Sequence, residues 1–495
     1  MKKILVTLFF LSIGFSSFSL ASYEEAENAF KQKNYALALQ KVMPEVEKGA
    51  PDAQHLLSVM YMGGYGVDKN ISEALKYARL SASQGYLFGV LSLGEAYEFG
   101  LGVAKDYSRA AELYELVAEK DIPQAKVALA RILRSGMAGG ERVDNNKRVF
   151  QLLRSAAAQN NASAQNDLGA MYSEGAGVEK RLDLALSLFR SSADQGNAVA
   201  QRNLGLIYYK GLGVKVDMVE ALKWYRLSAS QGDAAGQLGL GQMYEDGRVV
   251  SMDYPEAMRL YKLSAAQEYS LAEYKIGYLY WSGREGGENI SEAAKWFERA
   301  AVKGLDIAQE KLARMYELGK GVPKNEELAV KWYRKAASSG LQNSQYQLAR
   351  MLKDGRGVEQ NYPEAIRYFR VLSDGGMEVA TSELGLMYEH GLGLAQDFKK
   401  ALFYYRLAAE GNSDAGLVNL SRMYASGKGV GSNLIISCAL MLRAVSISPS
   451  DQQISNISAR LAFKLSADQY AKAQVLSNKI VVDGLSVIDS YMENF

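Results

Sequence analysis

A tyrosine that returns every 36 residues limits what this chain of 495 residues can fold into more than any other feature. The marker positions, two of them held by leucine, are Tyr61, Tyr97, Leu133, Tyr172, Tyr208, Tyr244, Tyr280, Tyr316, Leu352, Tyr388 and Tyr424. Every step is 36 residues, except that the step after Leu133 is three residues longer. A fixed period of this length is typical of stacked repeats, in which each unit packs only on its neighbours.

A small residue always stands three positions before the marker, and Leu or Ile stands one position earlier still, as Leu204 and Ile276 do. Glycine inside a helix costs about 1 kcal/mol relative to alanine, so its repeated use predicts that another helix approaches closely there. The small residues are Ser58, Gly94, Ala130, Gly169, Gly205, Gly241, Gly277, Ala313, Ala349, Gly385 and Ser421. The Leu and the marker share one helical face.

The position nine residues after the marker predicts the start of a second helix. Ten of the eleven residues there are Asn or Asp, which accept a hydrogen bond from a free backbone N–H at a helix N-cap. They are Asn70, Asp106, Asn145 (after the insertion), Arg181, Asp217, Asp253, Asn289, Asn325, Asn361, Asp397 and Asn433. A Glu three residues later predicts a capping box in five repeats, at Glu73, Glu220, Glu256, Glu292 and Glu364. The second helix then carries large aromatics, such as Trp224, Trp296 and Trp332, which we expect in the core.

A Gly-x-Gly recurs eight times just after the marker and raises the question of phosphate binding. The pairs are Gly64/Gly66, Gly100/Gly102, Gly175/Gly177, Gly211/Gly213, Gly319/Gly321, Gly355/Gly357, Gly391/Gly393 and Gly427/Gly429. A phosphate-binding glycine loop follows a strand, and no strand pattern precedes any of these pairs. We therefore predict a helix C-terminus with positive φ, followed by a turn.

These columns together resemble the Sel-one-like repeat family, relatives of the tetratricopeptide repeats. The resemblance covers about residues 49–444, and the fifth repeat, 196–231, fits nearly throughout. It implies an all-α fold, a right-handed α/α superhelical solenoid of about eleven helix-turn-helix repeats. Residues 22–48 and 445–495 are expected to form helical caps that shield the two ends. In the third repeat, SGMAGGERVDNN, a local change of geometry and simple loop drift both remain open; in the sixth and seventh we favour drift.

The first 21 residues have the pattern of a secretory signal peptide. Lys2 and Lys3 precede an apolar run, and Ser19-Leu20-Ala21 offers small residues for cleavage. The residue directly after the cleavage site is not a cysteine, so a lipid anchor is not expected. No later apolar run is long enough for membrane insertion. We expect export to the periplasm or the extracellular space of a Gram-negative-type bacterium.

Composition argues against several functional classes. Without Lys2 and Lys3 the chain balances 55 basic against 55 acidic residues, which gives no bulk attraction to nucleic acid. No Lys follows a Ser by three residues, as serine β-lactamase chemistry needs. The only histidines, His55 and His390, lie nine repeats apart, and Cys438, in an apolar helix, is expected to be a buried small residue. We predict no enzyme, cofactor or metal site, although a catalytic carboxylate pair stays open because Asp and Glu occur throughout.

The resemblance also implies where a partner binds. In tetratricopeptide relatives the first helix of each pair lines a concave groove, at positions −9, −6, −2, +1 and +2 from the marker. Tyr, Trp and Arg dominate binding hot spots because they bury much area and keep a polar group. The candidate groove residues are Arg202, Tyr209, Lys210, Tyr274, Tyr278, Trp281, Arg314, Tyr346 and Arg350. The alternative is that Tyr274 and Tyr278 only pack between repeats.

The sequence therefore predicts an exported scaffold or adaptor that binds protein partners in the cell envelope. A secreted factor that meets host proteins is an alternative with the same signal peptide. A module that binds peptidoglycan or another glycan is a third reading, favoured only by Trp281 and its tyrosine neighbours.

Overall fold

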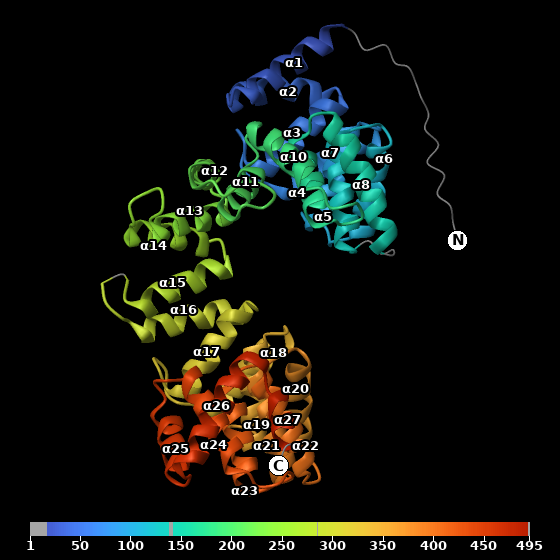
Figure 1. Ribbon diagram of the computed structural model, residues 1–495. Helices are drawn as coiled ribbons and strands as arrows, with labels where there is room; N and C mark the ends of the chain where they lie inside the picture. The colour runs from blue at the N-terminus through green and yellow to red at the C-terminus, as the bar shows by residue number, and fades with distance from the viewer. Residues whose placement is uncertain (1–16, 138–141, 285, 494–495) are drawn as a thin grey trace. The chain divides into compact units, whose positions relative to one another are not determined.

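The computed structural model describes residues 17–137, 142–284 and 286–493 (Figure 1). In these residues the chain forms 27 α-helices and no strand. Residues 1–253 and 254–495 form two compact units, here called unit 1 and unit 2. Most of the predicted signal peptide lies outside the described residues, and the first helix begins at Ser17.

The helices follow one another along the chain as pairs, each a first helix and a second helix joined by a turn. Unit 1 contains α1 (Ser17–Lys31), α2 (Tyr35–Glu47), α3 (Pro51–Gly63), α4 (Ile71–Ser83), α5 (Leu87–Phe99), α6 (Tyr107–Ala118), α7 (Pro123–Ser135), α8 (Arg142–Ala158), α9 (Ala162–Glu174), α10 (Leu182–Asp194), α11 (Ala198–Lys210), α12 (Met218–Ser230) and α13 (Ala234–Asp246). Unit 2 contains α14 (Tyr254–Ala265), α15 (Ser270–Ser282), α16 (Ile290–Val302), α17 (Asp306–Leu318), α18 (Glu326–Ser338), α19 (Gln342–Asp354), α20 (Tyr362–Asp374), α21 (Glu378–His390), α22 (Phe398–Glu410), α23 (Asp414–Ser426), α24 (Leu434–Ile447), α25 (Gln452–Phe463), α26 (Ala467–Asp483) and α27 (Ser486–Glu493).

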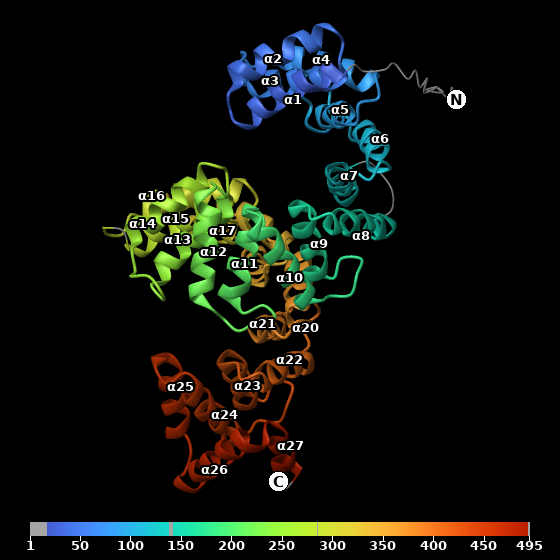
Figure 2. The same ribbon diagram turned by 90° about the horizontal axis from the view of Figure 1, so that it is seen from above.

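The eleven predicted repeats correspond to the eleven pairs from α3/α4 to α23/α24, which confirms the α/α solenoid. Within each unit, most helices pack on the helix before them and on the helix after them, as α22, α23 and α24 do in Figure 2. First helices of successive pairs also touch each other, as α11 touches α13 and α21 touches α23. The first helices therefore present neighbouring faces along each unit.

In the pairs where the small residue is glycine, it leaves room for an aromatic ring of the second helix. A Cβ placed on Gly205 would lie 2.6 Å from Cδ1 of Tyr225, closer than real Cβ atoms approach. Equivalent contacts join Gly94 to Tyr114, Gly169 to Phe189, Gly277 to Phe297 and Gly385 to Tyr405. The predicted close approach is confirmed. Trp224 and Trp332 are in the core as expected, whereas Trp296 is only half-buried.

The two glycines of each Gly-x-Gly have different structural roles. The first caps the first helix in the left-handed conformation, as Gly211 does at φ 71°. The second also has positive φ and lies against the start of the second helix of the preceding pair: a Cβ on Gly321 would be 2.5 Å from the carbonyl oxygen of Ile290. The predicted turn is confirmed, and it is also a packing contact between pairs.

The second helix begins at the predicted Asn or Asp in most pairs, but the predicted capping box is wrong. Asn70 accepts from the backbone N–H of Glu73 at 3.1 Å, as an N-cap should. However, the N–H of Asn70 donates to the carbonyl of Tyr61 at 2.9 Å, so it is not free for the Glu73 side chain, which binds Lys76 instead. The same backbone bond joins marker and N-cap in the other pairs, apart from α7/α8.

In the third pair, where the sequence left a local change of geometry and loop drift both open, the start of the second helix differs from the other pairs. Helix α8 begins at Arg142, so Asn145 is inside the helix and is not the predicted N-cap. The Nδ2 group of Asn145 donates to the carbonyl of Leu133 at 3.3 Å and so substitutes for the missing backbone bond. The inserted residues 138–141 lie outside the described residues.

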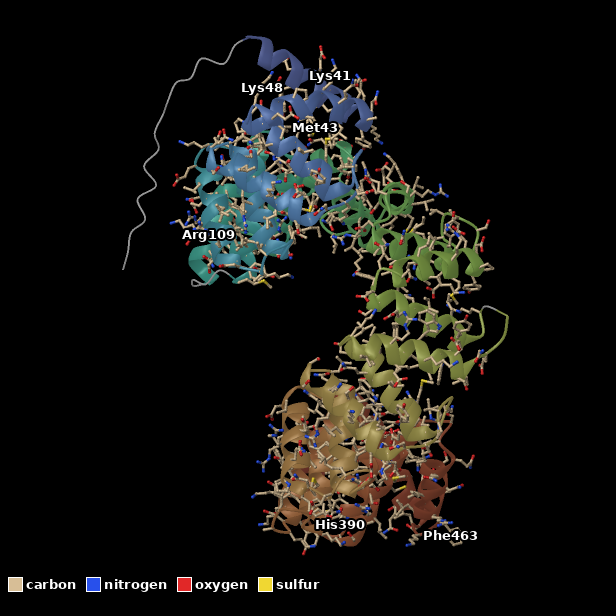
Figure 3. The ribbon with its side chains drawn as sticks, turned by 180° about the vertical axis from the view of Figure 1, so that it is seen from behind. Lys41, Met43, Lys48, Arg109, His390 and Phe463 are labelled. Atoms are coloured by element: carbon tan, nitrogen blue, oxygen red, sulfur yellow. The ribbon has the colours of Figure 1, made fainter. Side chains whose placement is uncertain are left out.

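The ends of the array are formed by α1/α2 and by α25, α26 and α27. Helix α27 is held on α22 by Arg406, whose Nη1 and Nη2 lie 2.7 and 2.5 Å from the carboxylate oxygens of Asp489. Phe463, at the end of α25, is 93% exposed and is labelled in Figure 3. Cys438 is fully buried, as predicted. None of the described helices combines the length and apolar character that crossing a membrane requires.

Candidate functional site

The three candidate residues of unit 1 lie on α11 and differ in their surroundings. The hydroxyl of Tyr209 donates to Oδ2 of Asp246 on α13 at 2.5 Å. Burial, together with this bond, raises the pKa of Tyr209 to about 12. Arg202 donates to the amide oxygen of Asn203 at 3.3 Å, and Lys210 is exposed at the end of the helix. Tyr209 thus joins two first helices, and only Lys210 is fully available at the surface.

In unit 2, the rings of Tyr274 and Tyr278 both lie partly buried against the hydrophobic core. The ring of Tyr274 lies 5.3 Å from that of Phe297 and contacts two hydrophobic clusters of the unit. Tyr278 packs on the cluster around Phe297, and the guanidinium of Arg284 lies 5.8 Å from its ring centre. These contacts favour the packing alternative that the sequence left open for both residues.

Trp281 forms one wall of a hollow at the end of α15. The hollow has a volume of about 150 Å³ and is lined by Trp281, Lys311, Arg314, Met315, Leu318 and Lys320. The Lys311 ammonium lies 4.3 Å from the centre of the Trp281 ring, a cation–π distance. Burial, and then the nearby Arg314, lower the pKa of Lys311. The site therefore concentrates positive charge on an apolar wall.

A second hollow of about 240 Å³ adjoins the first through shared residues Arg314 and Leu318. Its other lining residues are Glu317, Tyr333, Asn343, Gln347 and Arg350. Tyr346 lies beside it, with its ring 6.1 Å from that of Phe369 and the Arg350 guanidinium 5.9 Å from its centre. The structure thus brings Trp281, Arg314 and Arg350 to one continuous surface on α15, α17 and α19.

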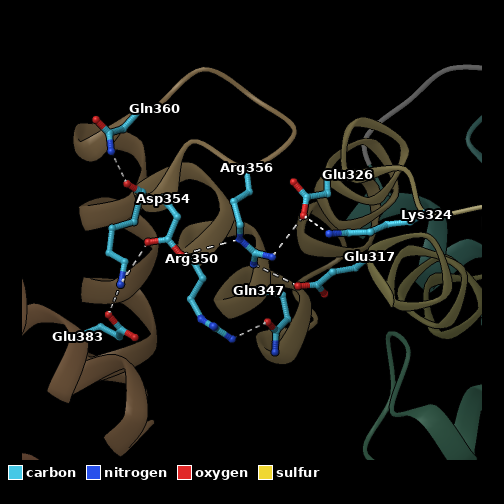
Figure 4. A network of polar contacts seen from close by, with 10 residues as sticks. Glu317, Lys324, Glu326, Gln347, Arg350, Asp354, Arg356, Gln360 and Glu383 are labelled. Atoms are coloured by element: carbon cyan, nitrogen blue, oxygen red, sulfur yellow. Dashed lines mark hydrogen bonds and ion pairs between the residues drawn. The ribbon is translucent and has the colours of Figure 1, made fainter. Parts of the chain in front are cut away.

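A polar network that the sequence analysis missed borders this surface (Figure 4). Arg356, in the turn after α19, lies 3.1 Å from Glu317 and 3.7 Å from Glu326. Lys353 lies 2.8 Å from Glu383 on α21. These ion pairs connect neighbouring helix pairs and remove Glu317 as a free charge. Their signal in the sequence is the Arg at the middle of Gly355-Arg356-Gly357, where the other seven Gly-x-Gly turns have uncharged or lysine residues.

Lys311 and Lys320 were also missed, because the groove positions taken from the tetratricopeptide relatives do not include them. Lys311 is five residues before the marker Tyr316, and Lys320 is in the turn after α17. Within the described ranges, no group of three or more His, Cys, Asp or Glu side chains could hold a metal ion.

The family model for the Sel1 repeat matches ten stretches of the chain, which together cover most of it. They are residues 51–86, 90–121, 162–197, 198–233, 234–269, 270–305, 306–341, 342–377, 379–413 and 415–446. The chain belongs to the Sel1-repeat family. The stretch between residues 121 and 162, which the matches leave out, holds the lengthened pair α7/α8 of this Sel1-repeat protein.

Three proteins with related sequences support this assignment, over different shares of the chain. The protective antigen c5321 of uropathogenic Escherichia coli, which has the same repeat fold, is 30% identical with a TM-score of 0.62; the match covers 92% of the Sel1-repeat chain and 97% of c5321. Chitin synthase regulatory factor 1 of Schizosaccharomyces pombe is 29% identical over 150 residues, 30% of this chain and 32% of that protein. A sel1-like repeat-containing protein, R815, of Acanthamoeba polyphaga mimivirus is 42% identical over 79 residues, 16% of this chain and 15% of R815. The chain thus spans a third or less of these two curated relatives. A Sel1 solenoid is an architecture typical of protein–protein interaction.

Proposed function

We propose that this Sel1-repeat chain is an exported adaptor that binds a partner protein on the first-helix surface of unit 2. The observation that carries the proposal is the pair of adjoining hollows on α15, α17 and α19: Trp281 lines the first, Arg350 lines the second, and Arg314 lines both. Trp and Arg at the centre of a hollowed surface are the residues that most often dominate the energy of protein interfaces.

The cationic face of this surface favours protein over glycan as the partner. Sugar rings stack on open aromatic faces, and the Trp281 ring already has Lys311 at 4.3 Å. On the face of the ring where Lys311 lies, a glycan would have to displace that ammonium, whereas an acidic side chain of a protein segment can pair with it. The regulatory role in the name of the fission-yeast relative agrees with a binding function, although the two chains share only about a third of their lengths.

Export is the second part of the proposal and rests on residues 1–21. Lys2, Lys3, the apolar run and Ala21 fit a secretory signal peptide, so the adaptor would work in the periplasm or outside the cell. A host-facing role is the second candidate function. It is favoured by the E. coli relative, which is described as a protective antigen and matches nearly the whole length of this chain.

Crosslinking in the native cell tests the proposal. A photoreactive benzoyl-phenylalanine replaces Trp281, and mass spectrometry identifies what it captures. The matched control carries the same group at Lys335, an exposed residue of the second helix α18 whose ammonium also lies over a tryptophan, Trp332, at 4.5 Å. We expect one envelope or host protein from position 281 only. Capture from position 335 only, or of glycan alone, would contradict the proposed surface or the proposed partner class.

A further inference from the structure

Three cations around the hollow beside Trp281 have no ion-pair partner among the residues that the structure describes. They are Lys311, Arg314 and Lys320, all on α17 or the turn that follows it. Lys311 is half-buried, and burying an ammonium is unfavourable unless it forms a close ion pair. Two other basic residues on first helices of unit 2 do form ion pairs, Lys353 with Glu383 and Arg422 with Glu389. The hollow instead gathers three basic side chains that form no ion pair with the described residues.

The nearest carboxylates are occupied by other groups. Glu310 accepts from the Asn343 amide at 2.8 Å and from the Ser344 hydroxyl at 2.7 Å. Glu317 accepts from the Tyr333 hydroxyl at 2.9 Å and pairs with Arg356 at 3.1 Å. Both carboxylates are thus turned toward α19 and α18, and neither forms an ion pair with Lys311 or Arg314.

The remaining walls of the hollow are apolar. Met315 is buried at the base, and Leu318 is 52% exposed at the edge beside the Trp281 ring. A ligand that satisfies this site needs an apolar group of side-chain size and a negative charge next to it. Aspartate or glutamate adjacent to a large apolar residue in a protein segment provides both.

We infer that the hollow binds an acidic segment of the partner protein, in which an apolar side chain packs on Trp281, Met315 and Leu318 while a neighbouring carboxylate pairs with Lys311 and Arg314. The inference rests on the proposed function and specifies the chemistry of the partner. Lys320 at the mouth adds attraction at longer range, because exposed charges act over about 10 Å at 0.1 M salt.

Selection from a random peptide library displayed on phage, with the full chain immobilised, tests the inference. Enriched peptides are synthesised with both ends blocked, so that only side-chain carboxylates carry negative charge, and their Kd is measured by fluorescence anisotropy. We expect an Asp or Glu next to a large apolar residue, and binding that weakens about tenfold when that acid becomes the amide. Arg314→Glu, at an exposed position, should weaken binding at least as much, and Lys335→Glu on α18 is the matched control that should not change it.

Two results would overturn the inference in distinguishable ways. If neutral peptides are enriched and Trp281→Ala abolishes their binding, the carboxylate pairing is wrong but the protein-binding surface stands. If no peptide binds, or if none is affected by Trp281→Ala or Arg314→Glu, the inference fails and the proposed surface fails with it. Circular dichroism of each variant checks that the helices are retained.

Discussion

The ring of Tyr225 lies directly over Gly205, with no room for a Cβ between the ring and the α11 backbone. This contact sets how closely the two helices of the pair approach. Ala313 occupies the equivalent place in the pair that contains Tyr333, so the fold accepts a methyl group at this position in another pair.

Replacing Gly205 by alanine should therefore destabilise the protein moderately. The new methyl group overpacks the ring, at a cost of about 1–3 kcal/mol, and about 1 kcal/mol is recovered from helix propensity. We expect a net loss of up to about 2 kcal/mol in urea unfolding. Gly431→Ala is the control, since Gly431 has no heavy atom near the added methyl, and it should have almost no effect. An equal effect of the two substitutions would mean that the ring contact does not limit helix approach.

The second glycine of the turn should be more sensitive than a glycine that only needs positive φ. Gly321 (φ 74°) has the carbonyl of Ile290 in the place of a Cβ, whereas Gly304 (φ 91°) has open space. Alanine at residue 304 should cost about 1 kcal/mol for the backbone conformation alone. Alanine at residue 321 should cost at least about 2 kcal/mol more, because backbone atoms have to move. Thermal unfolding of both variants measures the difference.

Removing the hydroxyl of Tyr209 should loosen the contact between α11 and α13. Tyr209→Phe deletes a short hydrogen bond to a carboxylate, which contributes about 1.5–3 kcal/mol, and leaves Asp246 with the Gln242 amide at 2.7 Å. Because a solenoid is stabilised by nearest-neighbour contacts, we expect faster amide exchange confined to this joint. A double-mutant cycle with Asp246→Asn should give a coupling energy well above zero. A coupling energy near zero would mean that the Tyr209–Asp246 bond does not stabilise the contact between α11 and α13. Tyr209 would then again be a candidate binding residue.

His55 on α3 should make the stability of unit 1 depend on pH. Burial lowers the pKa of His55 from 6.5 to about 4, since its ring packs between Tyr86 and Phe88 and only the Ser92 hydroxyl, 3.4 Å away, contacts Nδ1. Below pH 6.5 the unfolded chain binds a proton that the folded chain does not, so stability falls from pH 6.5 to pH 4 and not further.

The measurement compares the wild type with His55→Gln across that range. We expect the wild type to lose about 2 kcal/mol more than the variant between pH 7.5 and pH 4.5. Ser92→Ala is the control: it keeps the imidazole buried, so the free energy of unfolding should depend on pH as it does in the wild type. Parallel profiles for wild type and His55→Gln would show that the ring is protonated without penalty in the folded chain.

The sequence was sufficient for the helix pairs because their determinants are local. A glycine at the end of a helix, an Asn nine residues after the marker and a small residue under a ring each act within one pair, so the repeat reveals them. The capping box was predicted wrongly because the local pattern, Asn70 with Glu73, allows the Asn70 N–H two acceptors: the Glu73 carboxylate or a backbone carbonyl. Only the folded turn shows that the Tyr61 carbonyl takes it.

The candidate surface was less predictable because it depends on contacts between pairs. Gln231 donates to Gln201 at 2.8 Å and Gln195 to Gln165 at 2.7 Å, a recurring link whose residues are visible in the sequence but whose pairing is not. Whether Tyr274 packs or binds depends on the ring of Phe297 in the second helix. The charge on Lys311 matters only because Glu310 is turned toward α19, which no column of the repeat indicates.

The turn-closing bond from the N-cap N–H to the marker carbonyl has an evolutionary consequence. The Tyr208 carbonyl accepts from Asp217, and the Tyr316 carbonyl from Asn325, each at 2.9 Å and each inside its own pair. In the turns whose residues are all described, no main-chain hydrogen bond depends on which pair precedes or follows; a neighbour has only to leave space for a glycine. In-phase duplication or loss of one gene segment can therefore lengthen or shorten the array without leaving any turn incomplete, and binding hollows can be gained or discarded one pair at a time.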